Sequence, residues 1–408
     1  MFDDFGLTEE QKAIQTLSRK FAQEHIRPIA AKIDDMPVSE KKGGKPVLVH
    51  GYLATSFPWD LVKAAYDVGL KTITLPEKYG GQYIDFCTQV VIMDELGYEC
   101  ASCCKTITQM WKHPQMVLDN ATKDQCDRWL SPLKDKWDYF FAVAQTEPSG
   151  ASDTLIPYDG PEGGIHMRVE KKKDGYVLNG TKTFIALGGV ASVYLTAGRT
   201  DPTVSTTKGT SYFFVPKDAP GFSVISQQNK SGFRAYPNGE LAYDNVFVPK
   251  EDLWGGKENT PLSAKGRSVG WNEIELSGGA MGMCRSAYEK AVEYAKTRVQ
   301  GGKPIIQHQL IGGMLADMYM LLQAGRSLLW KTAWDFDHKR VNPLLSLTLA
   351  RYTNHICQQL LPMALSVFGG SGVMKELPME KYIRDALIYI HLSDGPSRTV
   401  AAHQLIMR

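Results

Sequence analysis

The sequence has little of what marks a secreted or membrane protein. Its seven cysteines are an odd number scattered through 408 residues, which does not make a disulfide framework and favours a reducing compartment. No apolar run in it reaches the roughly 18 residues that a membrane span requires. No charged-then-apolar leader opens the chain. We therefore expect a soluble, cytoplasmic protein without membrane insertion.

An excess of charge of one sign is also missing. The formal net charge is +2 and 43% of the residues are hydrophobic, so the composition gives no reason to expect nucleic acid or a membrane surface as a partner. Clustered metal ligands are scarce as well. Cys100 and Cys103 have a C-x-x-C spacing, but no second ligand pair accompanies them. Zinc or redox chemistry is therefore the minor interpretation, and we expect no metal.

The length and the hydrophobic period predict several domains. A chain of 408 residues exceeds what one hydrophobic core commonly supports. Helical periodicity gives way to short strand-like runs near residue 138 and returns after residue 250. We expect an α+β fold with an N-terminal all-α domain (1–137), a β-barrel-like middle domain (138–250) and a C-terminal four-helix-bundle domain (251–408). The strand-like runs are 140–144, 176–178, 193–195, 211–215 and 222–225.

Residues 384–398, RDALIYIHLSDGPSR, place an acidic side chain beside a turn. Apolar side chains would bury this segment on most sides, and Gly395 followed by Pro396 stops a continuing helix. A carboxylate at the lip of an apolar site is a candidate general base, because desolvation raises the pKa of a carboxyl group towards the working pH. Aspartate is also common in such turns, and these residues alone favour a turn role for Asp394.

The motif Arg-Asp-Ala at 384–386, followed by an Ile-Tyr pair and an acidic residue before glycine, resembles the last catalytic segment of flavin-dependent acyl-CoA dehydrogenases. In most of that family the acid is a glutamate followed by Gly-Thr, and it removes the α-proton of the acyl thioester. Counting without a gap puts Ser393 at this position, whereas anchoring on Gly395 puts Asp394 there. A minority of relatives read Asp-Gly-Pro, so the resemblance favours Asp394 as the base.

The resemblance begins at the first helix and covers nearly the whole chain. Thr8 is the expected N-cap and Gln11 its capping-box partner, in a Leu-Thr-Glu-Glu-Gln start similar to the family's opening. We expect Pro28 to end this helix. Residues 35–56, rich in Lys, Gly and Pro, stand where the family passes directly to its next helix. We interpret them as an insertion, and as surface decoration rather than a lid, because loops tolerate extra length at small entropic cost.

Two segments of the middle region resemble the family's flavin segments. The Thr-Glu-Pro-x-x-x-Ser-Asp loop at 146–153 implies that Thr146 contacts the flavin pyrimidine edge and that Ser152 helps to hold the CoA arm. In the second segment Phe184 stands at an aromatic position and can stack on the isoalloxazine ring. Ala186 replaces a threonine or serine and cannot supply the hydroxyl that relatives place near flavin N5, a loss of roughly 1 kcal/mol of hydrogen bonding.

The C-terminal region carries the expected diphosphate contacts of FAD. The run RVQGGKPIIQHQ at 298–309 is similar to a family segment whose arginine reaches the FAD of a neighbouring subunit, and a guanidinium offers paired donors to a diphosphate. The resemblance therefore implies a homotetramer in which Arg298 and Gln309 contact FAD. The glycine-rich break at Gly369 and Gly370 is similar to the loop that approaches the same diphosphate.

For the residues that contact the substrate, the sequence leaves alternatives open. Family members use the helix around 103–105 to floor the acyl pocket, which implies that Cys103, Cys104 and Lys105 line it. A lysine in such a helix more often extends to solvent, but an inward Lys105 would pair with an acidic group at the far end of the acyl chain. Glu273 replaces a common arginine beside a helix from which some relatives draw their base, and we keep it as a reserve base.

The resemblance predicts an FAD-dependent acyl-CoA dehydrogenase that forms an enoyl-CoA, with electron-transfer flavoprotein as the electron acceptor. The altered residues widen the substrate range under consideration to alicyclic or carboxylated acyl groups. They also keep open a redox-neutral reaction on the same ligands, such as an elimination or desulfination. A third alternative is an inactive relative that only binds CoA esters.

Overall fold

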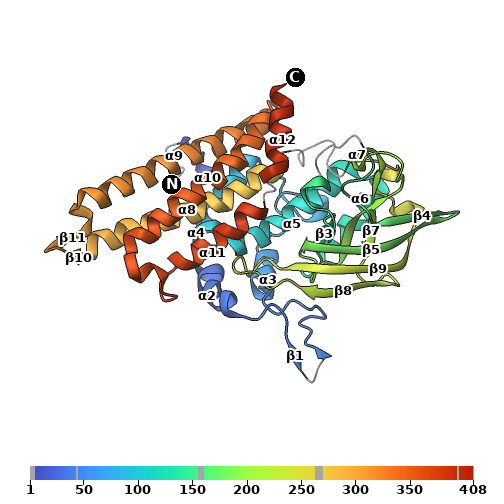
Figure 1. The fold of residues 1–408 in the computed structure, drawn as a ribbon, viewed down its shortest axis with the longest axis horizontal. Helices are drawn as coiled ribbons and strands as arrows, with labels where there is room; N and C mark the ends of the chain where they lie inside the picture. Colours follow the sequence, from blue (N-terminus) through green and yellow to red (C-terminus); the bar gives the residue numbers. More distant parts are fainter. Residues whose placement is uncertain (1–4, 43–44, 155–159, 262–269, 393–394, 408) are drawn as a thin grey trace.

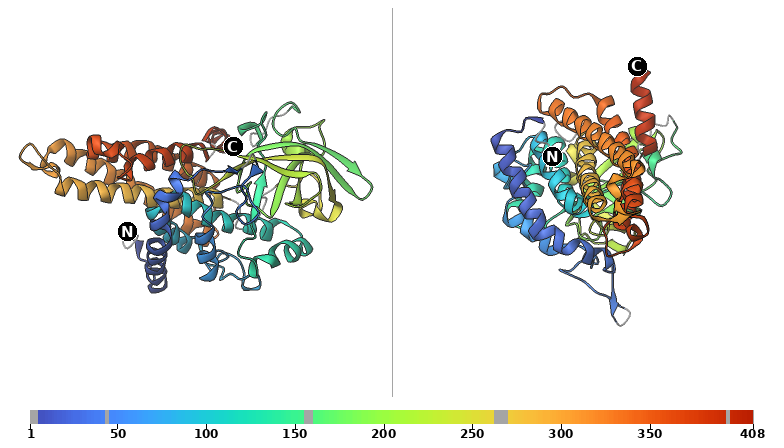
Figure 2. Two further views of the ribbon diagram at one scale, coloured as in Figure 1. Left: turned by 90° about the horizontal axis from the view of Figure 1, so that it is seen from below. Right: turned by 90° about the vertical axis from the view of Figure 1, so that its left-hand side faces the viewer.

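A computed structural model describes residues 5–42, 45–154, 160–261, 270–392 and 395–407 (Figure 1). Helices from the two ends of the chain pack together on one side, and the strands form a sheet on the other. The long helices of the C-terminal region extend as an arm away from the sheet (Figure 2). The expected order of a helical, a β and a second helical region is therefore confirmed.

The N-terminal region begins with the predicted capping box. Thr8 accepts from the backbone N–H of Gln11 at 3.1 Å, and the Gln11 side chain accepts from the Thr8 N–H at 3.1 Å. The expectation that Pro28 ends the helix is wrong, because the helical run continues through it. It lies in the first turn of the next helix, where a missing N–H costs nothing. The helices are α1 (Glu9–Phe21), a π-helical turn (Ala22–Ile26), α2 (Arg27–Asp35), α3 (Trp59–Asp67), α4 (Phe86–Glu99), α5 (Ala101–Asn120) and α6 (Lys123–Leu130).

The segment 35–56 contains a short hairpin that projects from the body of the protein (Figure 1). Its strands are β1 (Lys41–Lys42) and β2 (Lys45–Pro46). Tyr52 anchors the end of the segment, because its ring stacks on Trp59 at 5.2 Å and its hydroxyl accepts from Lys217 Nζ at 3.0 Å. The segment thus joins the helical region to the middle region.

The middle region is one sheet with the strand order β3-β6-β4-β5-β9-β8, and β7 pairs with β6. The five predicted runs coincide with β3, β5, β6, β7 and β8, and only the first extends one residue beyond its strand, at Phe140. The five runs do not include β4 or β9; the charged residues RVEKK of β4 are mostly exposed and carry no apolar alternation. The strands are β3 (Phe141–Ala144), β4 (Arg168–Lys172), β5 (Gly175–Ala186), β6 (Val193–Arg199), β7 (Thr210–Pro216), β8 (Phe222–Gln227) and β9 (Asn238–Pro249).

A buried ion pair fastens the loop after β3 to this sheet. Lys182 Nζ on β5 lies 2.7 Å from Glu147 Oε1, and both side chains are almost completely buried. The Glu147 carboxylate also accepts from the backbone N–H groups of His166 at 2.7 Å and Met167 at 2.9 Å. Burial lowers the pKa of Lys182 to about 8, against the raising effect of Glu147. The Glu147 carboxylate therefore has hydrogen-bond partners within the protein on both of its oxygens.

The C-terminal region is a bundle that packs against α4 through glycines. A Cβ added at Gly97 on α4 would lie 2.3 Å from the carbonyl oxygen of Gly279, and one at Gly282 would lie 2.4 Å from that of Asp94. Only glycine permits this approach of the two backbones. The elements are α8 (Trp271–Thr297), the hairpin β10 (Val299–Gln300) and β11 (Lys303–Pro304), α9 (Gln309–Asp337), α10 (Pro343–Phe368), α11 (Met379–Leu392) and α12 (Gly395–Ile406).

Among the described residues, one segment is long and apolar enough to cross a membrane by length and composition. It is Pro343–Val373, which includes α10, and 44% of its most apolar window is buried inside the protein. A core helix of a soluble protein has the same properties, and α10 packs on α8, α9, α11 and α12.

Replacing Glu147 by glutamine should destabilise the protein by about 3 kcal/mol, because the buried Lys182 would lose its counter-charge. Unfolding in denaturant, followed by circular dichroism, would measure this. Glu170→Gln on the exposed strand β4 is the matched control and should change the free energy of unfolding by no more than about 0.5 kcal/mol. Equal effects of the two substitutions would show that the buried pair has no special role.

Candidate functional site

The end of β5 presents an exposed aromatic ring in a strained backbone. Phe184 has φ +56° and its side chain is 62% exposed. The left-handed region costs a non-glycine residue roughly 1–2 kcal/mol, and here Asn238 holds it by donating to the Phe184 carbonyl at 2.8 Å. The neighbouring Thr183 N–H donates to the Thr146 carbonyl at 2.9 Å. Thr146 and Phe184 therefore lie together, and strain of this kind is typical of a binding site.

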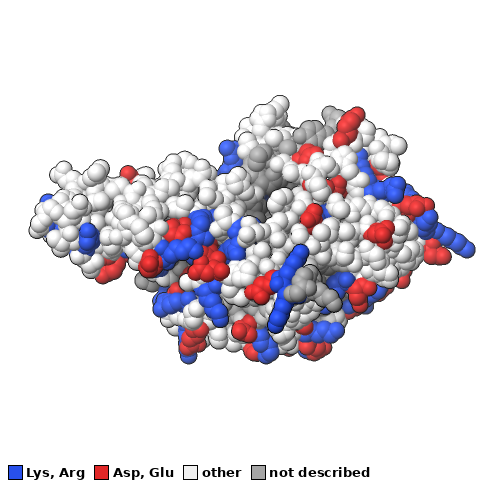
Figure 3. Space-filling model, turned by 60° about the horizontal axis from the view of Figure 1, so that its bottom comes forward, with Lys and Arg blue, Asp and Glu red and all other residues white. Residues whose placement is uncertain are grey.

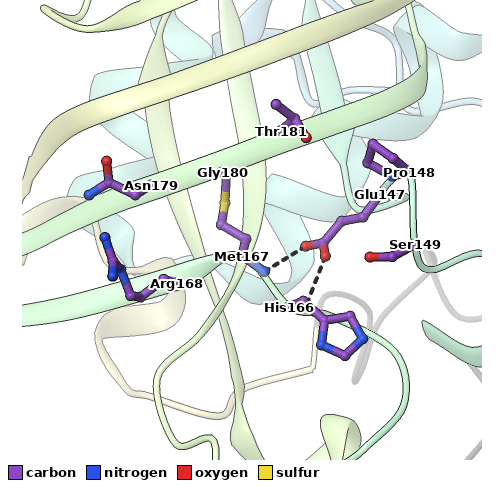
Figure 4. Close-up of a pocket in the computed structure, with 9 residues that line it drawn as sticks. All are labelled: Glu147, Pro148, Ser149, His166, Met167, Arg168, Asn179, Gly180 and Thr181. Carbon is purple, nitrogen blue, oxygen red and sulfur yellow. Dashed lines mark hydrogen bonds between the residues drawn. The ribbon is translucent and has the colours of Figure 1, made fainter.

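A groove of about 490 Å³ opens beside the same loop (Figure 4). Glu147 lines the groove, but its carboxylate points at the backbone N–H groups of the loop that precedes β4. It is therefore not free to bind a ligand. Ser152 follows the groove in sequence and starts a short 3-10 turn, where it is half-buried. The groove is lined by Glu147, Pro148, Ser149, His166, Met167, Arg168, Asn179, Gly180 and Thr181.

The far end of the bundle brings the predicted diphosphate residues together. Arg298 ends α8 and its carbonyl accepts from the Ile305 N–H at 2.8 Å, so the β10–β11 hairpin leads directly to Gln309. The rings of Tyr294 and Phe368 stack at 4.2 Å, which places the glycines that follow Phe368 next to the end of α8. All four predicted residues are exposed: Arg298, Gln309, Gly369 and Gly370.

Two properties of this end suit an anionic ligand. The Arg298 side chain has no hydrogen bond or ion pair within the part of the chain that the structure describes. A Cβ added at Gly369 or Gly370 would meet nothing within 4 Å, so the space beside these glycines is open. The hairpin lies at the outer tip of the arm and the strands that carry the aromatic site belong to the sheet (Figure 1). One chain therefore presents the two sets of residues in different places.

A layer of buried polar side chains lies between α5 and α8. Lys105 forms an ion pair with Glu275, and Thr108 donates to the same carboxylate. Lys105 is only 6% exposed, so the expectation that it extends to solvent is wrong. The buried Glu275, which faces it from α8, neutralises its charge inside the protein.

Two further contacts continue this layer. Lys112, two turns after Lys105 on α5, donates to the side-chain oxygen of Asn272 at the start of α8. Glu273 accepts from Arg398 Nε at 3.0 Å and pairs with its Nη2 at 3.0 Å. Burial lowers the pKa of Lys112 to about 8, and the nearby positive charges lower it further while Glu273 and Glu275 raise it.

The adjoining side of α5 holds neutral polar groups. Burial lowers the pKa of His113 to about 3, so this ring is neutral at physiological pH. Its Nδ1 contacts the Phe141 carbonyl at 2.7 Å, which ties α5 to β3. Gln109 accepts from the Tyr236 hydroxyl at 2.8 Å. Acid–base chemistry at neutral pH is therefore not expected from His113.

Three family models match the chain in succession. They are the N-terminal, middle and C-terminal domains of acyl-CoA dehydrogenase, at residues 8–136, 142–246 and 266–399. A mitochondrial 2-methylacyl-CoA dehydrogenase of Solanum tuberosum is 30% identical over 386 residues, which is 94% of this chain and 87% of that protein. The chain belongs to the acyl-CoA dehydrogenase family. It is thus an oxidoreductase that acts on CH–CH bonds.

Two further acyl-CoA dehydrogenases are similar to nearly the whole chain. A cyclohex-1-ene-1-carbonyl-CoA dehydrogenase of Syntrophus aciditrophicus is 30% identical over 381 residues, covering 93% of this chain and 85% of that protein. The solved butyryl-CoA dehydrogenase of Megasphaera elsdenii has a TM-score of 0.85 at 25% identity and covers 98% of this chain and 99% of that one. The predicted fold class is confirmed. Members of the family are FAD-binding flavoproteins, and the exposed Phe184 ring and Arg298 guanidinium fit this cofactor.

The predicted base lies outside the described residues, as does its alternative: these are Asp394 and Ser393. Glu273, the reserve base, is described, and an arginine engages its Oε1. Cys103 and Cys104 are buried, and the Cys104 thiol donates to the Met93 carbonyl at 3.6 Å, towards α4. Ala186 is half-buried at the end of β5.

Sequence reasoning missed Lys112, Thr108 and Arg398. A signal was present, because Lys105, Thr108 and Lys112 recur at a spacing of three and four residues, which places them on one face of a helix. That face could have been matched to the polar start of α8. The partner of Glu273 could not have been found, since Arg398 is 125 residues away in sequence.

Replacing Arg298 by alanine should weaken FAD binding about 10- to 100-fold, the cost of losing about 1.5–3 kcal/mol of hydrogen bonding to a charged group. Equilibrium dialysis of FAD against the purified variant would measure the dissociation constant. Lys296→Ala, at an exposed position two residues earlier, is the control and should leave that constant within about twofold. An unchanged constant in Arg298→Ala would remove the diphosphate role.

Proposed function

We propose that the protein is a homotetrameric dehydrogenase that converts an acyl-CoA thioester to the enoyl-CoA, with Asp394 as the base that removes the α-proton. The observation that carries the proposal is Phe184, an exposed aromatic ring kept in a strained conformation beside Thr146. Bound FAD supplies the acceptor for the hydride from the β-carbon. The chain then has to hold the thioester against that ring and remove one proton.

Both flanks of the segment 393–394 are fixed to other parts of the protein, which supports a positioned base. Before it, Asp385 on α11 accepts from the Phe233 N–H of the middle region at 2.6 Å, and Arg384 pairs with Asp34 of α2 at 2.6 Å. After it, Arg398 on α12 pairs with Glu273. An aspartate reaches roughly 1.5 Å less far than the usual glutamate, so the substrate carbon must come closer to the helix ends.

The surface of the bundle supports assembly of several copies. Few charged side chains lie on the projecting arm (Figure 3). Large hydrophobic side chains of α9 are exposed there, with Leu310 at 79% and Met320 at 60%, and an apolar groove of about 420 Å³ lies between α8 and α9. A neighbouring copy that covers this arm would bring its Arg298 to the other copy's Phe184 site. We assign the tetramer to the cytoplasm and expect electron-transfer flavoprotein to reoxidise it.

The acyl group is polar or alicyclic rather than a long fatty chain in this proposal. In family members this region forms the floor of the acyl pocket. In this chain, the layer between α5 and α8 contains Lys105, Thr108, Lys112, Glu273 and Glu275. A long alkyl chain against these groups would leave them without compensation from water, which costs free energy for every polar group desolvated.

The decisive experiment is anaerobic mixing of the enzyme with acyl-CoAs while the flavin absorbance is recorded. Asp394→Asn should slow flavin bleaching about 10²- to 10⁴-fold, the usual contribution of a general base. Glu376→Gln, at an exposed acidic position shortly before α11, is the control and should bleach within about twofold of the parent's rate. If Asp394→Asn bleaches as fast as the parent, Asp394 is not the base. Product formation without bleaching would favour a redox-neutral reaction instead.

Co-expression tests whether two copies share each FAD. Arg298→Ala and Phe184→Ala subunits should each bind FAD poorly alone. In a mixed pair, one site would keep the intact Phe184 of one copy and the intact Arg298 of the other, so about half of the sites should recover FAD. Tagging each subunit separately would isolate the mixed species for FAD quantification. Failure of any site to recover would contradict sharing.

A further inference from the structure

The polar layer between α5 and α8 has one cation more than it has anions among the described residues. Its carboxylates are Glu273 and Glu275, and each has its own partner, Arg398 and Lys105 respectively. Thr108 adds a hydrogen bond to the second pair. Lys112 is left over, and within the described ranges its contact is the neutral amide oxygen of Asn272.

An ammonium in this position favours a negative ligand. Two other cations and two carboxylates surround Lys112, and they nearly cancel, so its own charge is not compensated locally. Removing an ammonium from water without a counter-ion costs several kcal/mol, and a ligand anion would recover part of that cost. Asn272 fixes the ammonium by accepting one of its three N–H groups, which leaves two donors for a ligand.

The position within the fold identifies which part of the ligand would bind. Lys112 lies on α5, on the same face as Lys105 and Thr108, where the acyl end of the substrate is expected. The CoA arm is expected elsewhere, at Ser152 in the middle region. Lys105 cannot take the role, because Glu275 already neutralises it inside the protein. The anion is therefore expected on the acyl group itself.

We propose that Lys112 binds a carboxylate at the far end of the acyl group, so that the substrate is the CoA monothioester of a dicarboxylic acid. This inference rests on the proposed function and specifies its substrate class. Lys112 here is a specificity residue that contacts the substrate away from the carbons that react. Lys105, Glu275 and Thr108 form the adjoining part of the same polar layer.

The test compares two series of CoA esters of equal carbon number with the FAD-loaded enzyme. One series is succinyl-, glutaryl-, adipyl- and pimelyl-CoA, and the other is butyryl-, valeryl-, hexanoyl- and heptanoyl-CoA. Dissociation constants from isothermal titration under anaerobic conditions should favour the dicarboxylic ester at least tenfold for one or more lengths. In Lys112→Gln that preference should fall to within about twofold, while the monocarboxylic esters bind as before. Lys112→Arg should retain most of the preference, because it keeps the charge.

The unaltered protein provides a second test that needs no variant. The charged form of Lys112 is lost as the pH rises through about 8, so dicarboxylic esters should bind about tenfold more weakly for each pH unit above that value. Monocarboxylic esters should show no such slope between pH 7 and 9.

Three outcomes would overturn the inference. They are equal affinity for the two series at every length, equal weakening of both series by Lys112→Gln, and the same pH slope for both. Loss of flavin bleaching with every ester in the parent enzyme is a different result, since it would count against the proposed dehydrogenation. The binding preference would remain measurable in that case.

Discussion

The position of α8 depends on the contact of its backbone with that of α4. Gly282 of α8 lies where a side chain would collide with the Asp94 carbonyl oxygen of α4, and Gly97 of α4 lies where a side chain would collide with the Gly279 carbonyl oxygen of α8. A buried ion pair fixes the same seam, with Arg285 Nε 2.9 Å from Asp94 Oδ2. Because α8 is a continuous helix of 27 residues, this contact also determines where its polar first turns, with Asn272, Glu273 and Glu275, face α5 and α12.

The ion pairs of those first turns are not explained by stability alone. Buried ion pairs often contribute no more to stability than well-packed hydrophobic side chains of similar volume, because the charges must be desolvated. A pocket for an alkyl chain would be served by apolar residues at the same positions. Lys105, Glu275, Glu273 and Arg398 instead form two pairs in contact with further polar groups. Their presence is consistent with a ligand that itself brings polar or charged atoms into this layer.

Local signals in the sequence were sufficient for the fold, whereas long-range partners were needed for the site. Thr8 and Gln11 cap their helix within three residues of each other, and the strand runs rich in Phe, Tyr and Val form strands in the structure. The direction of Lys105 depends on Glu275, which is 170 residues away, and general lysine behaviour predicted the wrong direction. Pro28 shows the same limit on a smaller scale, because proline both ends helices and begins them.

The arrangement assigns separate tasks to separate parts of the chain. The sheet keeps Phe184 in a conformation that costs free energy, and it does so with hydrogen bonds from rigid strands, through Asn238 and through the loop that Glu147 and Lys182 fasten. The bundle tip presents Arg298 on a helix end beside open space. A cofactor that contacts both would link the exposed Phe184 ring to the exposed Arg298 guanidinium. The free energy spent on Phe184 would then be recovered on binding, because stacking covers the exposed ring.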